Sequence, residues 1–248
     1  MSSTFNPPMI TTSWDDGHPL DIKLSEYLIK HGIHGTFYTP RTSDRATLSA
    51  KEVWELSAQF EIGAHTLGHV DLLSVGQQRQ VEEIANSKKW VEDVTSKPCT
   101  MFCPPLGRFN RAIVDMVRDA GYLGMRTVEF ISIASPRLMS GVYVLPTSLQ
   151  LCNHNALIYV KNSAKRWSLP NLLNYAQFKI GRTLSEAVGA LINTIQKRGG
   201  CLHLWGHSWE IEEQGLWETL DQALGVMGSC GVRSVSNSGV CELNDARQ

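Results

Sequence analysis

Two short segments of the chain hold the residue types that a catalytic metal centre uses. Asp15 and Asp16 stand together directly after an apolar run, and His65 and His69 lie four residues apart further along the sequence. Two histidines and one carboxylate form a common open metal site, which leaves coordination positions for water and substrate. Adjacent residues that leave a strand point in opposite directions, so one aspartate can bind the metal while the other faces a reacting water.

Each segment taken alone also has a simpler interpretation. An aspartate followed by glycine, as in Asp16-Gly17, is typical of a plain turn, and for this segment alone the turn is the better interpretation. The two histidines could be surface residues, and Gly63 and Gly68 favour a strand end and a loop over a helix around them. Asp71 could orient a ligand, although we favour a solvated loop residue. Together, the two segments form the combination that a metallohydrolase needs.

Strand and helix patterns alternate along the chain, and these elements must position the polar clusters. Apolar and β-branched runs predict strands at residues 9–14, 35–38, 60–64, 100–103, 123–127, 142–145, 201–205 and 232–235. Helical spacing and helix-start signals at Ser49, Ser74, Asn110 and Thr183 predict helices between most of them. The helix after Ser74 should bury one apolar face, formed by Val81, Ile84 and Ala85.

This order predicts an α/β fold with a parallel sheet, either open or closed into a barrel, and one domain that spans residues 1–248. The polar clusters follow strand ends: Asp16 after the first strand, His65 after the third and His207 after a late one. In α/β folds this edge of the sheet gathers active sites. We therefore expect one site built from distant segments.

Composition excludes several classes of partner. The 248 residues carry a formal charge of −1 with both signs mixed, which does not fit a nucleic-acid-binding protein. No apolar run approaches the roughly 20 residues of a membrane span, and the N-terminus lacks the pattern of a secretory signal. The six cysteines show no Cys-x-x-Cys spacing, so we expect free thiols, a reducing compartment and a cytoplasmic protein.

The order of the motifs resembles the NodB-type polysaccharide deacetylases, which form carbohydrate esterase family 4. The resemblance runs from about residue 10 to 235, and its motifs are Trp14-Asp15-Asp16-Gly17, His65-Thr66-Leu67-Gly68-His69, Pro105-Leu106-Gly107 and Gly206-His207-Ser208. It implies a distorted (β/α) barrel of about seven parallel strands and a divalent metal, with zinc as the first expectation. Two histidines and one aspartate would also accept iron, cobalt or manganese.

The resemblance also implies a role for each residue. Asp16, His65 and His69 would be the metal ligands, and Asp15 the general base for a metal-activated water. His207 would be the general acid that protonates the leaving amine. The implied reaction is removal of an N-acetyl group from an amino sugar or oligosaccharide.

Other side chains near these motifs have less certain roles. His203 competes with His207 for the acid role, although a satisfied core histidine is the better interpretation of His203. Trp14, Trp205 and Trp209 could line a cleft that stacks sugar rings, but such aromatics more often belong to the core. Glu210 and Glu212 could orient His207 or lie in a wet loop.

Two departures from the family pattern stand out. The third motif normally begins with an arginine that pairs with the catalytic aspartate, and Cys103 occupies that position here. A cysteine cannot supply the donors of a guanidinium, so we expect Arg126 to take its place from the next strand, with Arg108 as a weaker substitute. The fourth motif, an aspartate followed by an aromatic residue, is missing between residues 128 and 166, where His154 could reach the site. These departures indicate a divergent branch with a reshaped cleft. Since no secretory signal is visible, we expect a soluble or carrier-linked sugar derivative as the substrate rather than extracellular peptidoglycan or chitin.

Two alternatives remain open at this point. The same metal ligands would serve an amidase that acts on a non-sugar formamide or a cyclic amide. A catalytically weak sugar-binding homologue could also keep the fold, and the loss of the motif arginine favours it slightly. The presence of Asp15, both histidines and His207 counts against the second alternative, because binding alone would not require that set.

Overall fold

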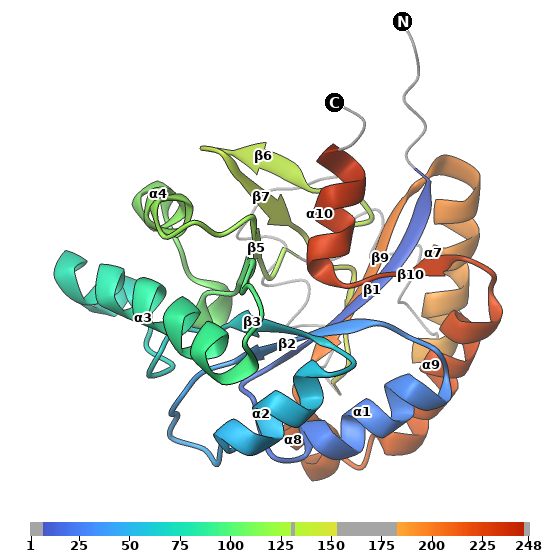
Figure 1. Cartoon of the computed structure of the whole chain (residues 1–248). Coiled ribbons are helices and arrows are strands. Elements are labelled where there is room, and N and C mark those ends of the chain that lie inside the picture. The colour runs from blue at the N-terminus through green and yellow to red at the C-terminus, as the bar shows by residue number, and fades with distance from the viewer. Residues whose placement is uncertain (1–6, 130–131, 153–182, 246–248) are drawn as a thin grey trace, which may run out of the picture.

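The computed structural model describes residues 7–129, 132–152 and 183–245 of the chain (Figure 1). The predicted α/β class is confirmed, because the described strands form one mostly parallel sheet in the order β6-β7-β5-β4-β3-β2-β1-β9-β8, with β10 also paired to β1. Only β6 runs antiparallel to its neighbour within this described sheet. The strands are β1 (Pro8–Asp15), β2 (Gly35–Thr39), β3 (Glu61–Ala64), β4 (Met101–Phe102), β5 (Gly124–Arg126), β6 (Arg137–Met139), β7 (Val142–Leu145), β8 (Leu149–Gln150), β9 (Gly200–Gly206) and β10 (Arg233–Ser234).

Helices connect the strands and cover the outer face of the sheet (Figure 1). They are α1 (Asp21–Lys30), α2 (Ala50–Ser57), α3 (Gln77–Thr95), α4 (Arg111–Asp119), α7 (Leu184–Arg198), α8 (Ser208–Glu213), α9 (Trp217–Ser229) and α10 (Asn237–Asp245), with short 3₁₀ turns η1 (Leu72–Ser74) and η2 (Pro105–Gly107). No described helix is both long and apolar enough to cross a membrane. The single domain over residues 1–248 stays a prediction.

The side chains of the strands alternate between two cores. Outward residues such as Ile10, Phe37 and Leu204 pack against the helices in the larger core. Inward residues such as Met9 and Tyr38 form a smaller core together with α10, which lies beside β1 and β5 (Figure 1). The period of two along each strand therefore assigns every strand residue to the helix side or to the interior of the curled sheet.

The curl of the sheet is visible in a contact between two distant strands. β1 and β5 are separated by three strands, which in a flat sheet would place them roughly 19 Å apart at about 4.8 Å per strand. The side chains of Asp15 on β1 and Arg126 on β5 nevertheless form an ion pair. The two strands can only meet in this way if the sheet bends toward its inner face.

Local sequence signals set most helix boundaries. The predicted capping boxes at Ser49 and Thr183 are both present, and Asn110 accepts a hydrogen bond from the backbone N–H of Ile113 at the start of α4. These side chains satisfy backbone donors that the first turn of a helix leaves free. The predicted helix start at Ser74 is wrong. Gly76 is the N-cap of α3, and the Ser74 hydroxyl donates to the Asp71 carbonyl instead.

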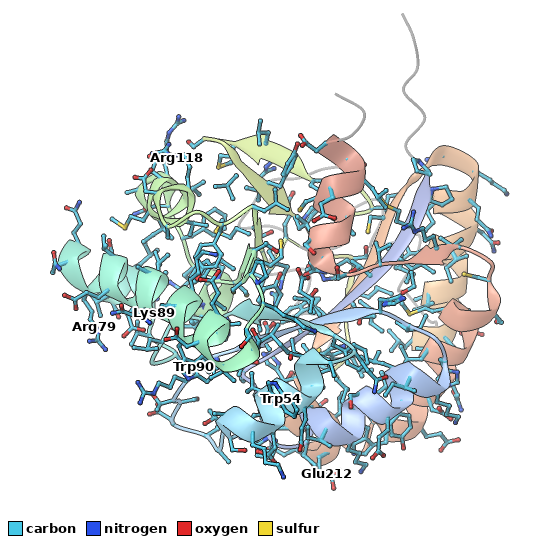
Figure 2. All side chains as sticks on the ribbon, viewed as in Figure 1. Trp54, Arg79, Lys89, Trp90, Arg118 and Glu212 are labelled. Carbon is cyan, nitrogen blue, oxygen red and sulfur yellow. The ribbon has the colours of Figure 1, made fainter. Side chains whose placement is uncertain are left out.

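The predicted apolar face of α3 is also partly wrong. Val81 is 42% exposed, whereas Ile84, Ser87 and Val91 are buried together with Glu83. The exposed side chain of Lys89 projects from the helix toward solvent (Figure 2). The buried Glu83 of this helix accepts a hydrogen bond from the backbone N–H of Gly68, in the loop between His65 and His69.

We predict that Gly63→Ala destabilises the fold by about 1–3 kcal/mol, because the added Cβ would lie 2.5 Å from the buried ring of Tyr38 on β2. The matched control is Gly189→Ala in α7, where the nearest side-chain atom, on Val226, is 3.9 Å away. The control should be neutral or stabilising by up to about 1 kcal/mol, since it removes a glycine from a helix. Thermal unfolding measures both changes, and equal melting temperatures would contradict the close packing of β2 on β3.

Candidate active site

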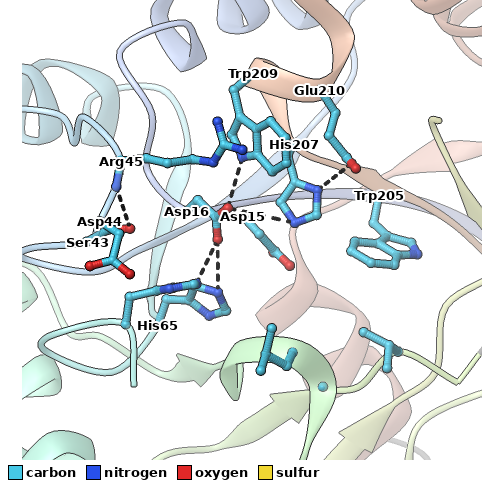
Figure 3. A pocket seen from close by; sticks show the side chains of 14 residues that line it. Asp15, Asp16, Ser43, Asp44, Arg45, His65, Trp205, His207, Trp209 and Glu210 are labelled. Atoms are coloured by element: carbon cyan, nitrogen blue, oxygen red, sulfur yellow. Dashed lines mark hydrogen bonds and ion pairs between the residues drawn. The ribbon is translucent and has the colours of Figure 1, made fainter. Parts of the chain in front are cut away.

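Asp16, His65 and His69 converge as the sequence predicts. Asp16 Oδ1 lies 3.4 Å from His65 Nε2 and 3.0 Å from His69 Nε2, and one ligand atom from each residue lies within 4.8 Å of the others. Figure 3 shows Asp16 and His65 facing each other at the floor of a pocket. Burial favours a raised pKa at Asp16, but the hydrogen bonds with His65 and His69 hold the pKa of that carboxyl well below its usual range.

The donor set fits a divalent metal ion. His65 Nδ1 lies 2.8 Å from the Cys103 carbonyl, and with the ring proton on Nδ1 the Nε2 atom would offer its lone pair to a metal ion bound beside Asp16. Two imidazole nitrogens and one carboxylate oxygen are ligands that zinc and related ions accept. These three residues are therefore the ones that would hold the ion.

Left-handed backbone conformations cluster at this site. Asp16, Thr66 and His69 have φ angles of 75°, 58° and 51°, a region that residues other than glycine rarely adopt. Such positions persist where the surroundings hold them, and they gather at functional sites. The Thr66 hydroxyl accepts a hydrogen bond from the Val70 N–H at 3.1 Å, which fastens the loop between the two histidines.

Glu83 holds the same loop from α3, and the sequence interpretation missed it. Its Oε2 accepts the Gly68 N–H at 2.8 Å, and its Oε1 pairs with Arg79 at 2.5 Å. The Glu83 side chain is 1% exposed. No local pattern marks this role, because the partner of the carboxylate lies in a different segment.

Asp15 pairs with Arg126 inside the sheet. Arg126 Nη2 donates to Asp15 Oδ2, and both side chains are buried. Although burial disfavours a charged guanidinium, Asp15 raises the pKa of Arg126 above its ordinary value. Burial also raises the pKa of the Cys103 thiol, so a neutral group stands at the position of the motif arginine. Arg108 pairs instead with Asp71 at 2.5 Å, which leaves Arg126 as the arginine beside Asp15.

His207 lies on the other side of Asp16. Its Nδ1 is 2.6 Å from Glu210 Oε2, and its Nε2 is 4.0 Å from Asp16 Oδ2. Burial favours a lowered pKa, but the hydrogen bond with Glu210 and the nearby aspartates give a net rise in the pKa of His207. Of the two glutamates considered, Glu210 therefore contacts His207, whereas Glu212 pairs with Lys23 on α1.

His203 has the environment of a core histidine. Its Nε2 lies 2.9 Å from the Ser13 hydroxyl and its Nδ1 lies 3.0 Å from the Pro146 carbonyl. Burial lowers the pKa of His203 to about 3. Both ring nitrogens are thus occupied away from the metal ligands. His154, the other histidine considered, lies outside the described residues.

The three predicted metal ligands, Asp15 and His207 line a cavity of about 490 Å³. Trp205 and Trp209 line it (Figure 3), whereas Trp14 is fully buried and donates its Nε1–H to Thr12, which agrees with the core role that the sequence favours for such aromatics. The remaining lining residues are Asp15, Asp16, Ser43, Asp44, Arg45, His65, His69, Leu106, Gly107, Val128, His207 and Glu210. One cavity therefore gathers the predicted ligands, Asp15 and His207.

The chain belongs to the polysaccharide deacetylase family, whose sequence model matches residues 2–125. That match covers both aspartates and both histidines but ends before Arg126 and His207. YxkH of Bacillus subtilis (strain 168), which is named as a polysaccharide deacetylase, is 26% identical over 121 residues. The match covers 47% of this chain and 41% of YxkH, so the chain matches less than half the length of that relative.

Solved structures confirm the NodB-type fold with its curled, mostly parallel sheet. A Mycobacterium smegmatis structure described as a polysaccharide deacetylase has a TM-score of 0.69 and 15% identity, covering 99% of this chain and 93% of the other. A family 4 acetyl xylan esterase from Clostridium thermocellum, solved with a cobalt ion, has a TM-score of 0.59 and 15% identity, covering 96% of this chain and 92% of the other. At these identities the likeness establishes the fold alone.

We predict that Arg126→Gln destabilises the protein by about 3–5 kcal/mol, because it leaves the buried Asp15 carboxylate without its counter-charge. The double variant Asp15→Asn/Arg126→Gln should be less destabilised than the sum of the two single variants, since it removes both charges. Arg137→Gln is the control: Arg137 pairs with Glu129 at 3.5 Å but is 57% exposed, so its loss should cost at most about 1 kcal/mol. Urea unfolding measures all four variants, and additive effects at the buried pair would contradict the prediction.

Proposed function

We propose that this protein is a metal-dependent deacetylase that hydrolyses an N-acetyl group of an amino sugar or oligosaccharide. The observation that carries the proposal is the convergence of Asp16, His65 and His69 in one cavity, with Asp15 and His207 beside them. Membership of the polysaccharide deacetylase family supports the reaction class. The cobalt ion in the Clostridium thermocellum esterase supports a metal in this fold.

Asp16, His65 and His69 would hold the metal, with zinc as the first candidate. When bound, such an ion supplies a Lewis acid that polarises an acetamide carbonyl and acidifies water. The chain's own contribution is to present three ligands on a loop that Glu83 and Thr66 fasten. It also places proton-transfer groups on both sides of that ligand set.

Asp15 is the proposed general base. Arg126 holds its Oδ2, while its Oδ1 has no hydrogen-bond partner among the described residues. The free oxygen can accept a proton from a water in the cavity that Asp15 lines. Arg126 is fully buried, so its part is to orient Asp15 and to balance its charge.

His207 is the proposed general acid. Glu210 fixes Nδ1, which leaves Nε2 on the side of Asp16 and the cavity. A proton on Nε2 can be donated to the amine that leaves when the amide bond breaks. The acid and the base thus come from two distant segments: His207 lies between β9 and α8, and Asp15 ends β1.

The cavity favours a sugar derivative. It has both the aromatic ring of Trp205 and several polar side chains in its lining, which suits the apolar faces and the hydroxyl groups of a sugar. A sugar-binding protein without turnover would not require Asp15, His207 and three metal ligands to meet in one cavity. An amidase that acts on a formamide or a cyclic amide would use the same residues, so only the identity of the substrate distinguishes this alternative from the proposal.

We predict that the chelated protein releases no acetate from short N-acetylglucosamine oligomers and regains activity when zinc or cobalt is added. Asp15→Asn should lower turnover by about 10²–10⁴-fold with the metal still bound. His65→Ala should lose activity together with metal binding, because it removes one of three ligands.

His34→Ala is the matched control, since His34 is exposed and uses only backbone groups in its hydrogen bonds. Full activity of Asp15→Asn would contradict the assigned base. A metal-loaded protein that releases no acetate but hydrolyses a formamide or cyclic amide would favour the amidase, and the absence of any bound metal would overturn the proposed function.

A further inference from the structure

We propose that Trp209 is a positioning residue that fixes the carboxylate of the metal ligand Asp16. The Trp209 Nε1–H donates to Asp16 Oδ2 at 2.9 Å (Figure 3). The other carboxylate oxygen, Oδ1, faces His65 and His69. This inference rests on the proposed metal site and assigns to α8 a role that none of the motifs predicts.

Trp209 adds to the contacts of Oδ1 with His65 and His69, because it holds the second carboxylate oxygen of Asp16. Asp16 follows the end of β1 in a left-handed conformation, with φ of 75°, and is followed by Gly17. The terminal torsion of an aspartate is broad, so the carboxylate can rotate unless a donor holds one oxygen. A hydrogen bond to Oδ2 leaves Oδ1 directed at the imidazoles, and groups of this kind orient metal ligands.

Trp209 is itself held in place. The Arg45 guanidinium lies 3.6 Å from the centroid of its ring, and Arg45 pairs with Glu213 at 3.1 Å. Glu213 is four residues after Trp209 on α8, so both side chains lie on one side of that helix. The arrangement ties the loop that carries Arg45 to α8 across the ring of Trp209 (Figure 3).

The same contacts limit another role for this ring. Arg45 covers part of the Trp209 ring, and the His207 ring lies 5.3 Å away, centroid to centroid. The indole N–H is already used by Asp16. Of the two tryptophans that line the cavity, Trp209 therefore serves the ligand set.

The test is Trp209→Phe, which keeps an aromatic ring under Arg45 and removes the N–H donor. We expect the affinity of the chelated full-length chain for cobalt or zinc to fall about 10–100-fold by calorimetric titration. We also expect the visible absorption bands of the bound cobalt to change, because they report the geometry of its ligands.

Trp217→Phe is the matched control. Trp217 also donates its indole N–H to a carboxylate of α8, that of Glu212, but this contact is exposed and outside the cavity. The control should bind cobalt with the affinity and spectrum of the unmodified chain. Arg45→Gln is a second variant at an exposed residue, and it should weaken cobalt binding by a smaller factor in the same direction.

The outcomes separate this inference from the proposed function. Cobalt affinity and spectrum that are unchanged in Trp209→Phe, or in Arg45→Gln if Trp209→Phe does not fold, would overturn the role of Trp209 and leave the proposed function standing. An unmodified chain that binds no cobalt or zinc would instead overturn the metal site itself. An equal loss in Trp217→Phe would show a general effect of indole removal and overturn the inference.

Discussion

The ion pair between Asp15 and Arg126 is the constraint on which the site depends. Two buried charges are costly to remove from water, and they are tolerated only when they lie together. Because the two residues stand on β1 and β5, their pairing requires the sheet to curl until its inner faces approach. The rings of Tyr38 and Trp205 lie 5.4 and 4.7 Å from the guanidinium and stabilise its charge through cation–π contacts. The curl that buries this pair is also what brings the carboxyl ends of distant strands around one cavity.

The metal ligands depend on a second kind of constraint, which is strain held by tertiary contacts. Asp16 and His69 adopt left-handed conformations that an isolated chain would rarely populate. Glu83 fastens the loop through Gly68, and Trp209 fastens the carboxylate of Asp16. Both fastening residues come from helices, which are more rigid than the loops they contact. Contacts with α3 and α8 therefore offset the strain of these backbone conformations.

The sequence predicts the parts of this structure that local signals determine. The capping boxes at Ser49 and Thr183 and the strand patterns gave elements that are present, because each depends on residues close in the chain. The proposed metal ligands were identified because their residue types and order resemble a family pattern. The contact of Glu83 with Gly68 and that of Trp209 with Asp16 were not predicted, since each depends on a partner in a distant segment. Trp209 lies on helix α8, whose six residues are too few to show a helical period in the sequence.

The exchange of the motif arginine for Cys103 has a geometric explanation in the register of the sheet. Strands β4 and β5 are parallel neighbours, and Phe102 pairs with Met125. The next residue on each strand, Cys103 and Arg126, therefore lies beside the other on the inner face of the sheet. Neighbouring strands are only about 4.8 Å apart, which is within the reach of an arginine side chain. Arg126 contacts Asp15 from β5, and the small neutral thiol of Cys103, directly after β4, stands where the family resemblance leads one to expect an arginine.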